Sequence, residues 1–188
     1  MARIGLKYYK YKKITIGTAA DGAETETYGE TKTLGKAMKL DAQVTFTNTA
    51  LYADDGIAES IKEFSGGTLS ADVDQIDDDA LTDIFGAEKD EDGGVTFRDN
   101  DTTSYIRVGT MTRAVKNGAV RYEVFIYAKV MLTPPSEGFE TKGENAAFKN
   151  DTLTGDIMRN CDGVWKIKRV FATEAEASTY LDTLGVSA

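Results

Sequence analysis

Histidine is absent from the 188 residues, and this absence excludes several kinds of catalytic and metal site. A serine or cysteine nucleophile paired with an imidazole base cannot be built, and neither can a zinc site with histidine ligands. Cysteine occurs once, at Cys161, so an internal disulfide and a cysteine-cluster metal site are excluded as well. Because a lone thiol usually behaves as a small apolar side chain, we expect Cys161 in the core.

Proline is scarce, and long apolar runs are missing. The only prolines are Pro134 and Pro135, and 41% of the residues are hydrophobic, so disorder over the whole chain is not expected. No apolar run has the length of a membrane helix or of a secretion-signal core. We therefore expect a chain that is made in the cytoplasm, is not inserted into a membrane and is not exported by the general route.

Positive charge is in short supply, and the negative charge is unevenly spread. The net charge is −9, yet the first 39 residues carry more basic than acidic side chains. Between Asp54 and Asp101 there are 16 acidic residues against three basic ones. Such a chain should repel nucleic acid rather than bind it tightly, and for any single carboxylate a role in solubility is the simplest interpretation.

The first third of the chain predicts an extended basic segment, a polar loop and a strand. Residues 4–16 are basic and rich in tyrosine, which indicates a strand or an N-terminal arm over residues 1–13. Residues 17–35 show neither a helical nor a strand period and predict a long loop. From Lys36 to Thr49 the pattern alternates, as in a half-buried strand, with one apolar face made of Met38, Leu40, Ala42, Val44 and Phe46.

The middle of the chain predicts a turn, two more strands and a short helix. A turn over residues 52–56 leads to strands over 57–64 and 67–73. A helix is expected over 77–85, because three aspartates suit its first turn and Gly86 can end it. Residues 88–94 predict a charged loop.

The last part of the chain contains the strongest hairpin signal, Asn117-Gly118 between residues 104–115 and 119–132. In the second of these strands, the even positions from Tyr122 to Leu132 are expected to share one face. The odd positions from Glu123 to Met131 are mixed, and this indicates contact with a helix or another subunit. A loop over 133–150 and a hairpin of 151–160 with 164–170 should follow. A helix over 173–185 is predicted by the capping box of Thr173 and Glu176.

These elements predict one mainly β (α+β) domain over residues 1–188. We expect two packed antiparallel sheets, as a sandwich or rolled barrel, with a flanking α-helix and long loops, because the strands do not alternate with helices.

Three acidic motifs suggest chemistry, but each has a simpler interpretation. Tyr52-Ala53-Asp54-Asp55 matches the metal-binding core of reverse transcriptases, yet the chain is short and acidic, and a solvated turn is favoured. The run from Asp90 to Gly94 resembles a calcium loop, but the sixth residue counted from Asp90 is Val95 and not glycine, and the twelfth is Asp101 and not glutamate. Asp77-Asp78-Asp79 matches the dipole of a helix start. We therefore expect no catalytic residue, no metal site and no cofactor.

The order of four segments resembles a known family. They are the start from Ile4 to Tyr9, the strand opening at Gly35, the stretch from Leu51 to Glu59 with its continuation to Leu69, and an aromatic strand, 122–132, running into the Pro134-Pro135 loop. Together they resemble the major tail proteins, or tail tube proteins, of long-tailed phages and prophages of Gram-positive bacteria.

This resemblance implies a structural virion protein and not an enzyme. It implies stacked rings, hexameric in the family, that form a tube for double-stranded DNA during ejection. The implied partners are further copies of the chain, the tape-measure protein, the tail terminator, and the baseplate or tip proteins. A head–tail completion protein or a surface adhesin domain of phage origin is the alternative.

The charge pattern and the resemblance together select two sets of candidate residues. The first set is expected to contact neighbouring subunits and comprises Arg3, Lys7, Tyr8, Tyr9, Lys10, Lys12, Lys13, Glu24, Glu26 and Tyr28. The second set is expected to line an acidic lumen and comprises Asp54, Asp55, Glu59, Asp72 and Asp74.

Overall fold

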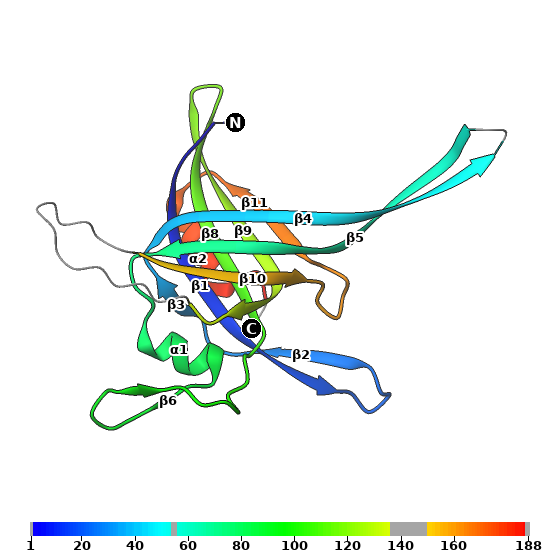
Figure 1. The fold of residues 1–188 in the computed structure, drawn as a ribbon. Helices are drawn as coiled ribbons and strands as arrows, with labels where there is room; N and C mark the ends of the chain where they lie inside the picture. Colours follow the sequence, from blue (N-terminus) through cyan, green and yellow to red (C-terminus); the bar gives the residue numbers. More distant parts are fainter. Residues whose placement is uncertain (1, 54–55, 136–149, 187–188) are drawn as a thin grey trace, which may run out of the picture.

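A computed structural model describes residues 2–53, 56–135 and 150–186, and in this part the chain forms eleven strands and two helices (Figure 1). The mainly β class with flanking helices is confirmed. The elements are β1 (Ala2–Thr18), β2 (Glu24–Tyr28), β3 (Lys32–Gly35), β4 (Ala37–Ala53), β5 (Gly56–Val73), α1 (Asp78–Phe85), β6 (Glu88–Lys89), β7 (Val95–Thr96), β8 (Ile106–Lys116), β9 (Ala119–Thr133), β10 (Asp151–Met158), β11 (Lys166–Phe171) and α2 (Glu174–Thr183).

Nine of the strands form one antiparallel sheet, and β6 and β7 form a small second one. The order in the large sheet is β2-β1-β8-β9-β10-β5-β4, with β3 added beside β1 and β11 beside β9. The predicted hairpin of 151–160 with 164–170 is wrong in its pairing. Its two strands do not pair with each other, because β10 pairs with the end of β9 and with β5, whereas β11 pairs with residues 122–127 of β9.

The large sheet rolls so that its two halves enclose the main core. Side chains of β1, β8 and β9 pack against those of β5 and β10, and α1 contributes Ala80, Ile84 and Phe85 to the same cluster. The Tyr9 hydroxyl of β1 donates a hydrogen bond to the Lys39 carbonyl of β4, which ties the two halves together. Helix α2 covers the opposite face of β8 and β9, where Leu181 and Leu184 are fully buried.

An irregularity in β9 overturns the prediction that its even positions share one face. Ile106 faces Val130, but Val108 already faces Tyr127, so β9 has one extra residue between these pairs. Such a bulge reverses the direction of all following side chains. Val124 and Ile126 consequently pack under α2, whereas Val130 and Leu132 belong to the main core together with Tyr127.

The N-terminal segment is a strand, as predicted, but it is not a free arm. β1 pairs with β8 from Ala2 to Lys13, and Tyr9 and Tyr11 are buried in the core. The expected loop over residues 17–35 is also wrong, because β2 forms a hairpin with the end of β1 and β3 pairs with its middle. Threonine and glutamate alternate in β2, and exposed edge strands tolerate such polar composition.

The two strands predicted over 57–64 and 67–73 form one strand, β5, which runs through Gly66-Gly67. Its partner β4 follows it along its whole length, and the register shifts where Thr45 faces Gly66 and Phe46 faces Phe64. Beyond this bulge the β4–β5 hairpin leaves the body of the molecule and projects far outward (Figure 1).

Local signals at turns and helix ends are confirmed. Asn117 and Gly118 both adopt positive φ, as the tight turn between β8 and β9 requires. The Thr173 and Glu176 capping box is formed, and α1 ends at Gly86 with φ of 75°. The predicted loop over 88–94 carries β6 and a tight turn to β7. Cys161 is exposed, so its predicted place in the core is wrong: it lies in the turn between β10 and β11.

Candidate assembly surface

The outer part of the β4–β5 hairpin, here called the distal hairpin (residues 46–64), exposes both of its faces. Among its described side chains, Phe46, Leu51 and Ile61 are 51%, 60% and 59% exposed. Pairs directly opposite each other in the register point to the same side of the ribbon. One face therefore carries Leu51, Ile61, Glu59 and Glu63, and the other carries Phe46, Asn48 and Lys62.

Aromatic stacking fastens the distal hairpin at its base. The Phe64 ring stacks on the Trp165 ring, with centroids 5.0 Å apart and an angle of 8° between their planes. Phe46 meets Phe64 edge-on at 6.3 Å, and the Arg159 guanidinium lies over Phe64 at 5.4 Å. The base of the ribbon is thus held by the segment between β10 and β11, whereas the ribbon beyond it depends on its own ladder.

Strand β4 ends the large sheet, and its outer edge pairs with no described strand. An exposed edge offers a row of N–H and C=O groups for another strand to pair with. A two-stranded ribbon without a covered face is also only marginally stable in water. The hairpin therefore has the features of an element that another molecule completes.

A cleft of about 540 Å³ opens between β1 and β4, where the rolled sheet does not close. Its floor is formed by Thr110 and Thr112 of β8 with Phe125 and Tyr127 of β9, and Lys166 of β11 stands beside them. Arg3, Leu6 and the start of β4 form the rims. The cleft is the open end of the main core, because the bulge in β9 turns Phe125 and Tyr127 toward the interior.

Three cations surround the Phe125 ring in this cleft. The guanidinium of Arg3 lies 4.9 Å from the ring centroid, and the ammonium groups of Lys166 and Lys168 lie at 5.2 Å and 5.5 Å. Arg3 and Lys168 each lie 2.7 Å from the Glu123 carboxylate, which is 1% exposed. Burial by itself raises the pKa of Glu123, but the hydrogen bonds from Arg3 and Lys168 outweigh it and lower that pKa.

Lys166 differs from the other two cations because no described carboxylate pairs with it. Its ammonium group lies 5.4 Å from the centroid of Tyr127, in addition to its contact with Phe125. Burial and the nearby charges of Arg3 and Lys168 lower the pKa of Lys166. Lys39 and Asp41 also line the cleft, but they pair with each other, so the cleft combines an apolar floor with excess positive charge.

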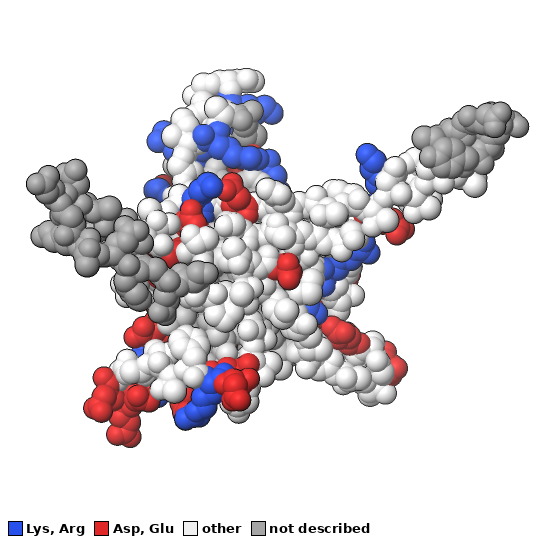
Figure 2. Space-filling view, in the orientation of Figure 1, with Lys and Arg blue, Asp and Glu red and all other residues white. Residues whose placement is uncertain are grey.

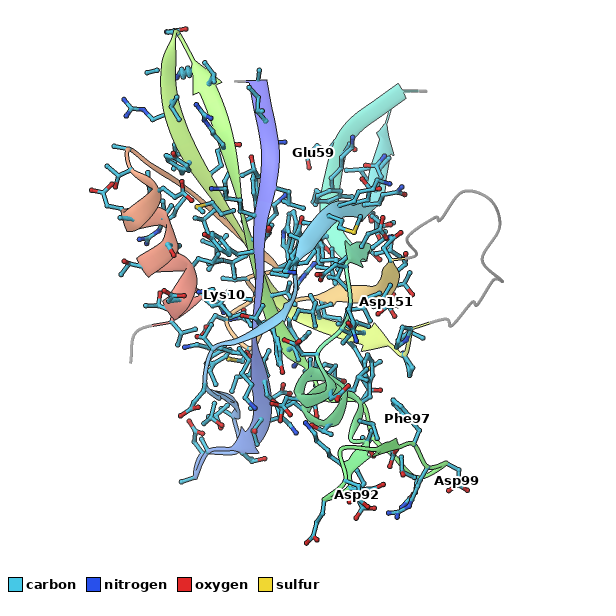
Figure 3. All side chains as sticks on the ribbon, turned by 90° about the vertical axis from the view of Figure 1, so that its left-hand side faces the viewer. Lys10, Glu59, Asp92, Phe97, Asp99 and Asp151 are labelled. Carbon is cyan, nitrogen blue, oxygen red and sulfur yellow. The ribbon has the colours of Figure 1, made fainter. Side chains whose placement is uncertain are left out.

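Several predicted contact residues of the N-terminal segment are engaged within the subunit. Arg3 pairs with Glu123, Lys7 Nζ lies 2.7 Å from Glu174 of α2, and Lys10 pairs with Asp182. These cations neutralise acidic groups of their own subunit. We expected this segment to contact acidic surface on a neighbouring subunit. Lys7 and Lys10 (labelled in Figure 3) instead pair with carboxylates of their own subunit.

The two tyrosines of this segment have opposite surroundings. Tyr9 is 0% exposed and belongs to the core, so its expected contact with another subunit is wrong. Tyr8 is 44% exposed and adopts a left-handed φ of 58° where the β1–β8 register shifts. Such a conformation costs a bulky residue about 1–2 kcal/mol. Lys12 is half-buried and Lys13 is exposed, and the structure pairs neither with a described carboxylate.

Glu24, Glu26 and Tyr28 of β2 lie in a polar network that joins the β1–β2 hairpin to the body. Lys129 Nζ lies 3.2 Å from Glu24 and 3.1 Å from Glu26, whose side chain is 0% exposed. The Tyr28 hydroxyl donates to Glu26 at 2.9 Å. Burial lowers the pKa of Lys129, but hydrogen bonds to Glu26 and Glu24 outweigh this and raise it. Glu26 and Tyr28 thus support the fold itself.

The expected lumen residues do not form one cluster. Asp54 and Asp55 lie outside the described residues. Glu59 is on the distal hairpin, whereas Asp72 and Asp74 are at the opposite end of β5, where Asp72 accepts a hydrogen bond from Thr152 and Asp74 pairs with Lys36.

The charge of the molecule is divided between its two ends. Figure 2 shows Lys and Arg gathered near the N-terminus and the β8–β9 turn, and Asp and Glu gathered around β6. Figure 3 shows Asp92 and Asp99 at this acidic end, far from Glu59. The acidic segment 54–101 therefore extends from the distal hairpin to the other end of the molecule.

The cleft and Lys166 were not among the sequence-derived candidates. Their signal was the mixed face of β9, which predicted contact with a helix or another subunit. Only Phe125 and Tyr127 of that face lie in the cleft, because the bulge turns Lys129 and Met131 to the other side. β11 also had to be placed beside β9 before Lys166 could be associated with the cleft.

No family model matches the sequence, and no curated protein matches it. Within residues 2–53, 56–135 and 150–186, no three Cys, Asp or Glu side chains gather as metal ligands would. The same part of the chain contains no helix with the length and apolarity needed to span a bilayer.

Proposed function

We propose that this chain is a self-assembling structural subunit, the major tail protein of a long-tailed phage or prophage, and that it has no catalytic role. The observation that carries this proposal is the distal hairpin. It projects from the body with apolar side chains on both faces, and no described element of its own subunit covers them.

The physical argument concerns the cost of leaving this hairpin uncovered. Exposed apolar patches with open strand edges mark interaction sites in stable proteins. Rings of identical subunits would cover the hairpins, and stacked rings, six subunits each in the resembled family, would make a tube. In that assembly the further partners are the tape-measure, terminator and baseplate or tip proteins, and the chain resides in the virion tail after synthesis in the host cytoplasm.

The charge of the chain fits a conduit for double-stranded DNA. With a net charge of −9, the subunit should not retain a polyanion, and carboxylates on the wall would keep DNA from adhering. At physiological salt this repulsion acts within about 8 Å of the wall, which suits a narrow passage.

Self-assembly of the purified protein tests the proposal. We expect rings or tubes in negative-stain electron microscopy at high protein concentration, and a rising mass in light scattering. The matched variant replaces residues 47–63 by Asn-Gly, since Phe46 and Phe64 face each other and a two-residue turn can join them. It should stay folded and monomeric. A wild-type chain that stays monomeric at every concentration would contradict the proposal. Single rings that never stack would favour a head–tail completion protein.

A further inference from the structure

The cleft between β1 and β4 is built to receive an anionic and partly apolar group. Its floor offers the rings of Phe125 and Tyr127, and Leu6 and Met38 add apolar surface at the rims. Arg3 and Lys168 share the buried Glu123, so two cations there face one carboxylate. Lys166 adds a third positive charge with no described partner, which leaves the cleft with an excess of positive charge.

One face of the distal hairpin has the complementary chemistry. Leu51 faces Glu59, Thr49 faces Ile61 and Thr47 faces Glu63 in the β4–β5 register, so these six side chains share one side. This acidic face carries two exposed apolar side chains and two carboxylates, and no described cation pairs with Glu59 or Glu63. The opposite face carries Lys62 and is not complementary to the cleft.

The same subunit cannot bring these two surfaces together, because β4 itself separates them. Residues 38–42 of β4 form a rim of the cleft, whereas residues 46–53 of the same strand project away from it. Eight extended residues span about 26 Å, which is enough to reach an adjacent molecule. The complementary surfaces are therefore available to two different copies.

We propose that the acidic face of the distal hairpin of one copy lies in the β1–β4 cleft of a second copy, with Glu59 and Glu63 beside Lys166 and Arg3. This inference rests on the proposed function as a self-assembling subunit and names the contact that joins neighbours. Because the two surfaces differ, the contact is heterologous and propagates to a closed ring or an open filament.

Charge reversal on each side tests this contact. The hairpin variant is E59K/E63K and the cleft variant is R3E/K166E, which leaves Lys168 to pair with Glu123 and places two unpaired carboxylates in the cleft. Like charges in contact cost several kcal/mol, so each variant alone should need at least about tenfold more protein for half-maximal assembly. The matched control is K62E, on the opposite face of the hairpin, which should assemble like the wild type.

Mixing the two variants gives the decisive measurement. In an equimolar mixture, the reversed hairpin fits the reversed cleft, and the unchanged hairpin fits the unchanged cleft. The mixture should therefore assemble at a concentration near that of the wild type, as measured by light scattering and electron microscopy. Circular dichroism and thermal unfolding of each variant confirm that its subunit is folded before mixing.

The outcomes separate this inference from the proposed function. If the wild type assembles and both reversed variants assemble equally well, the hairpin does not occupy the cleft. If each variant fails alone and the mixture also fails, the charges act elsewhere and the pairing is wrong. A wild type that never assembles overturns the proposed function and this contact together.

Discussion

At the scale of single residues, Glu123 shows how a buried charge is kept in this fold. Arg3 and Lys168 both reach it from more exposed positions, so either cation alone can satisfy it. We expect Arg3→Ala and Lys168→Ala each to lower the free energy of unfolding by about 1 kcal/mol or less. Together they should cost about 3 kcal/mol, because the carboxylate is then buried without a partner. Urea denaturation of the four proteins in this cycle measures the difference.

The control for this cycle is E123Q, which removes the charge that both cations satisfy. In the E123Q background the two alanine substitutions should cost about 1 kcal/mol in total, in line with exposed ion pairs. Additive losses in the unsubstituted background would show that the cations do not substitute for each other.

The pH dependence of stability follows from the same carboxylate. The folded pKa of Glu123 lies below its usual value of 4.5, so folding favours the ionised form. Its contribution is fully present above the unfolded pKa and is lost as the pH falls through the folded pKa. Denaturation curves between pH 7 and pH 3 should therefore show a smaller loss of stability in E123Q than in the wild type.

At the scale of elements, the capping box at the start of α2 could be recognised in the sequence. The Thr173 hydroxyl accepts a hydrogen bond from the Glu176 N–H, and Glu176 accepts one from the Thr173 N–H. Thr173→Ala should lower the free energy of unfolding by about 1 kcal/mol. Thr179→Ala, on the exposed side of α2, should change it by less than about 0.5 kcal/mol. Equal losses at both positions, measured by thermal unfolding, would contradict a role for the cap.

The base of the distal hairpin can be observed through the only tryptophan of the chain. Replacing Phe64 by leucine removes the ring stacked on Trp165, and we expect the fluorescence emission to move to longer wavelength because water reaches the indole. Stability should fall by about 0.5–1.5 kcal/mol, as for other aromatic pairs. Phe97→Leu, at the acidic end of the molecule, is the control and should leave the emission unchanged.

Element identity could largely be predicted from the sequence, whereas pairing could not. The Asn117-Gly118 turn and both helices carry local signals, and these signals act within a few residues. The pairing of β1 could not be predicted, because it depends on residues far away in the sequence. Tyr9 and Tyr11 become buried only when β8, β5 and α1 surround them. The faces of β9 could not be assigned because nothing in its residues marks the bulge near Ala128. The cleft depends on all of these pairings at once.

At the scale of the whole molecule, the balance between charge and apolar contact in assembly can be measured with salt. The proposed contact joins Glu59 and Glu63 to a cationic cleft, and salt shortens the reach of such attraction from about 10 Å at 0.1 M to about 3 Å at 1 M. We expect wild-type assembly to require several-fold more protein at 0.5 M than at 0.05 M sodium chloride. The E59Q/E63Q variant keeps Leu51 and Ile61 but lacks the charges, so its assembly should respond little to salt.

Assembly that does not respond to salt would be driven by apolar contact and not by charge. Apolar surface contributes about 25 cal/mol per Å² buried, and added salt does not screen this contribution. If the wild type and the E59Q/E63Q variant assembled equally well and equally independently of salt, the apolar side chains and the open edge of β4 would hold the subunits together. A steep salt dependence confined to the wild type would instead show that neighbours recognise each other by charge, since only the carboxylates distinguish the two proteins.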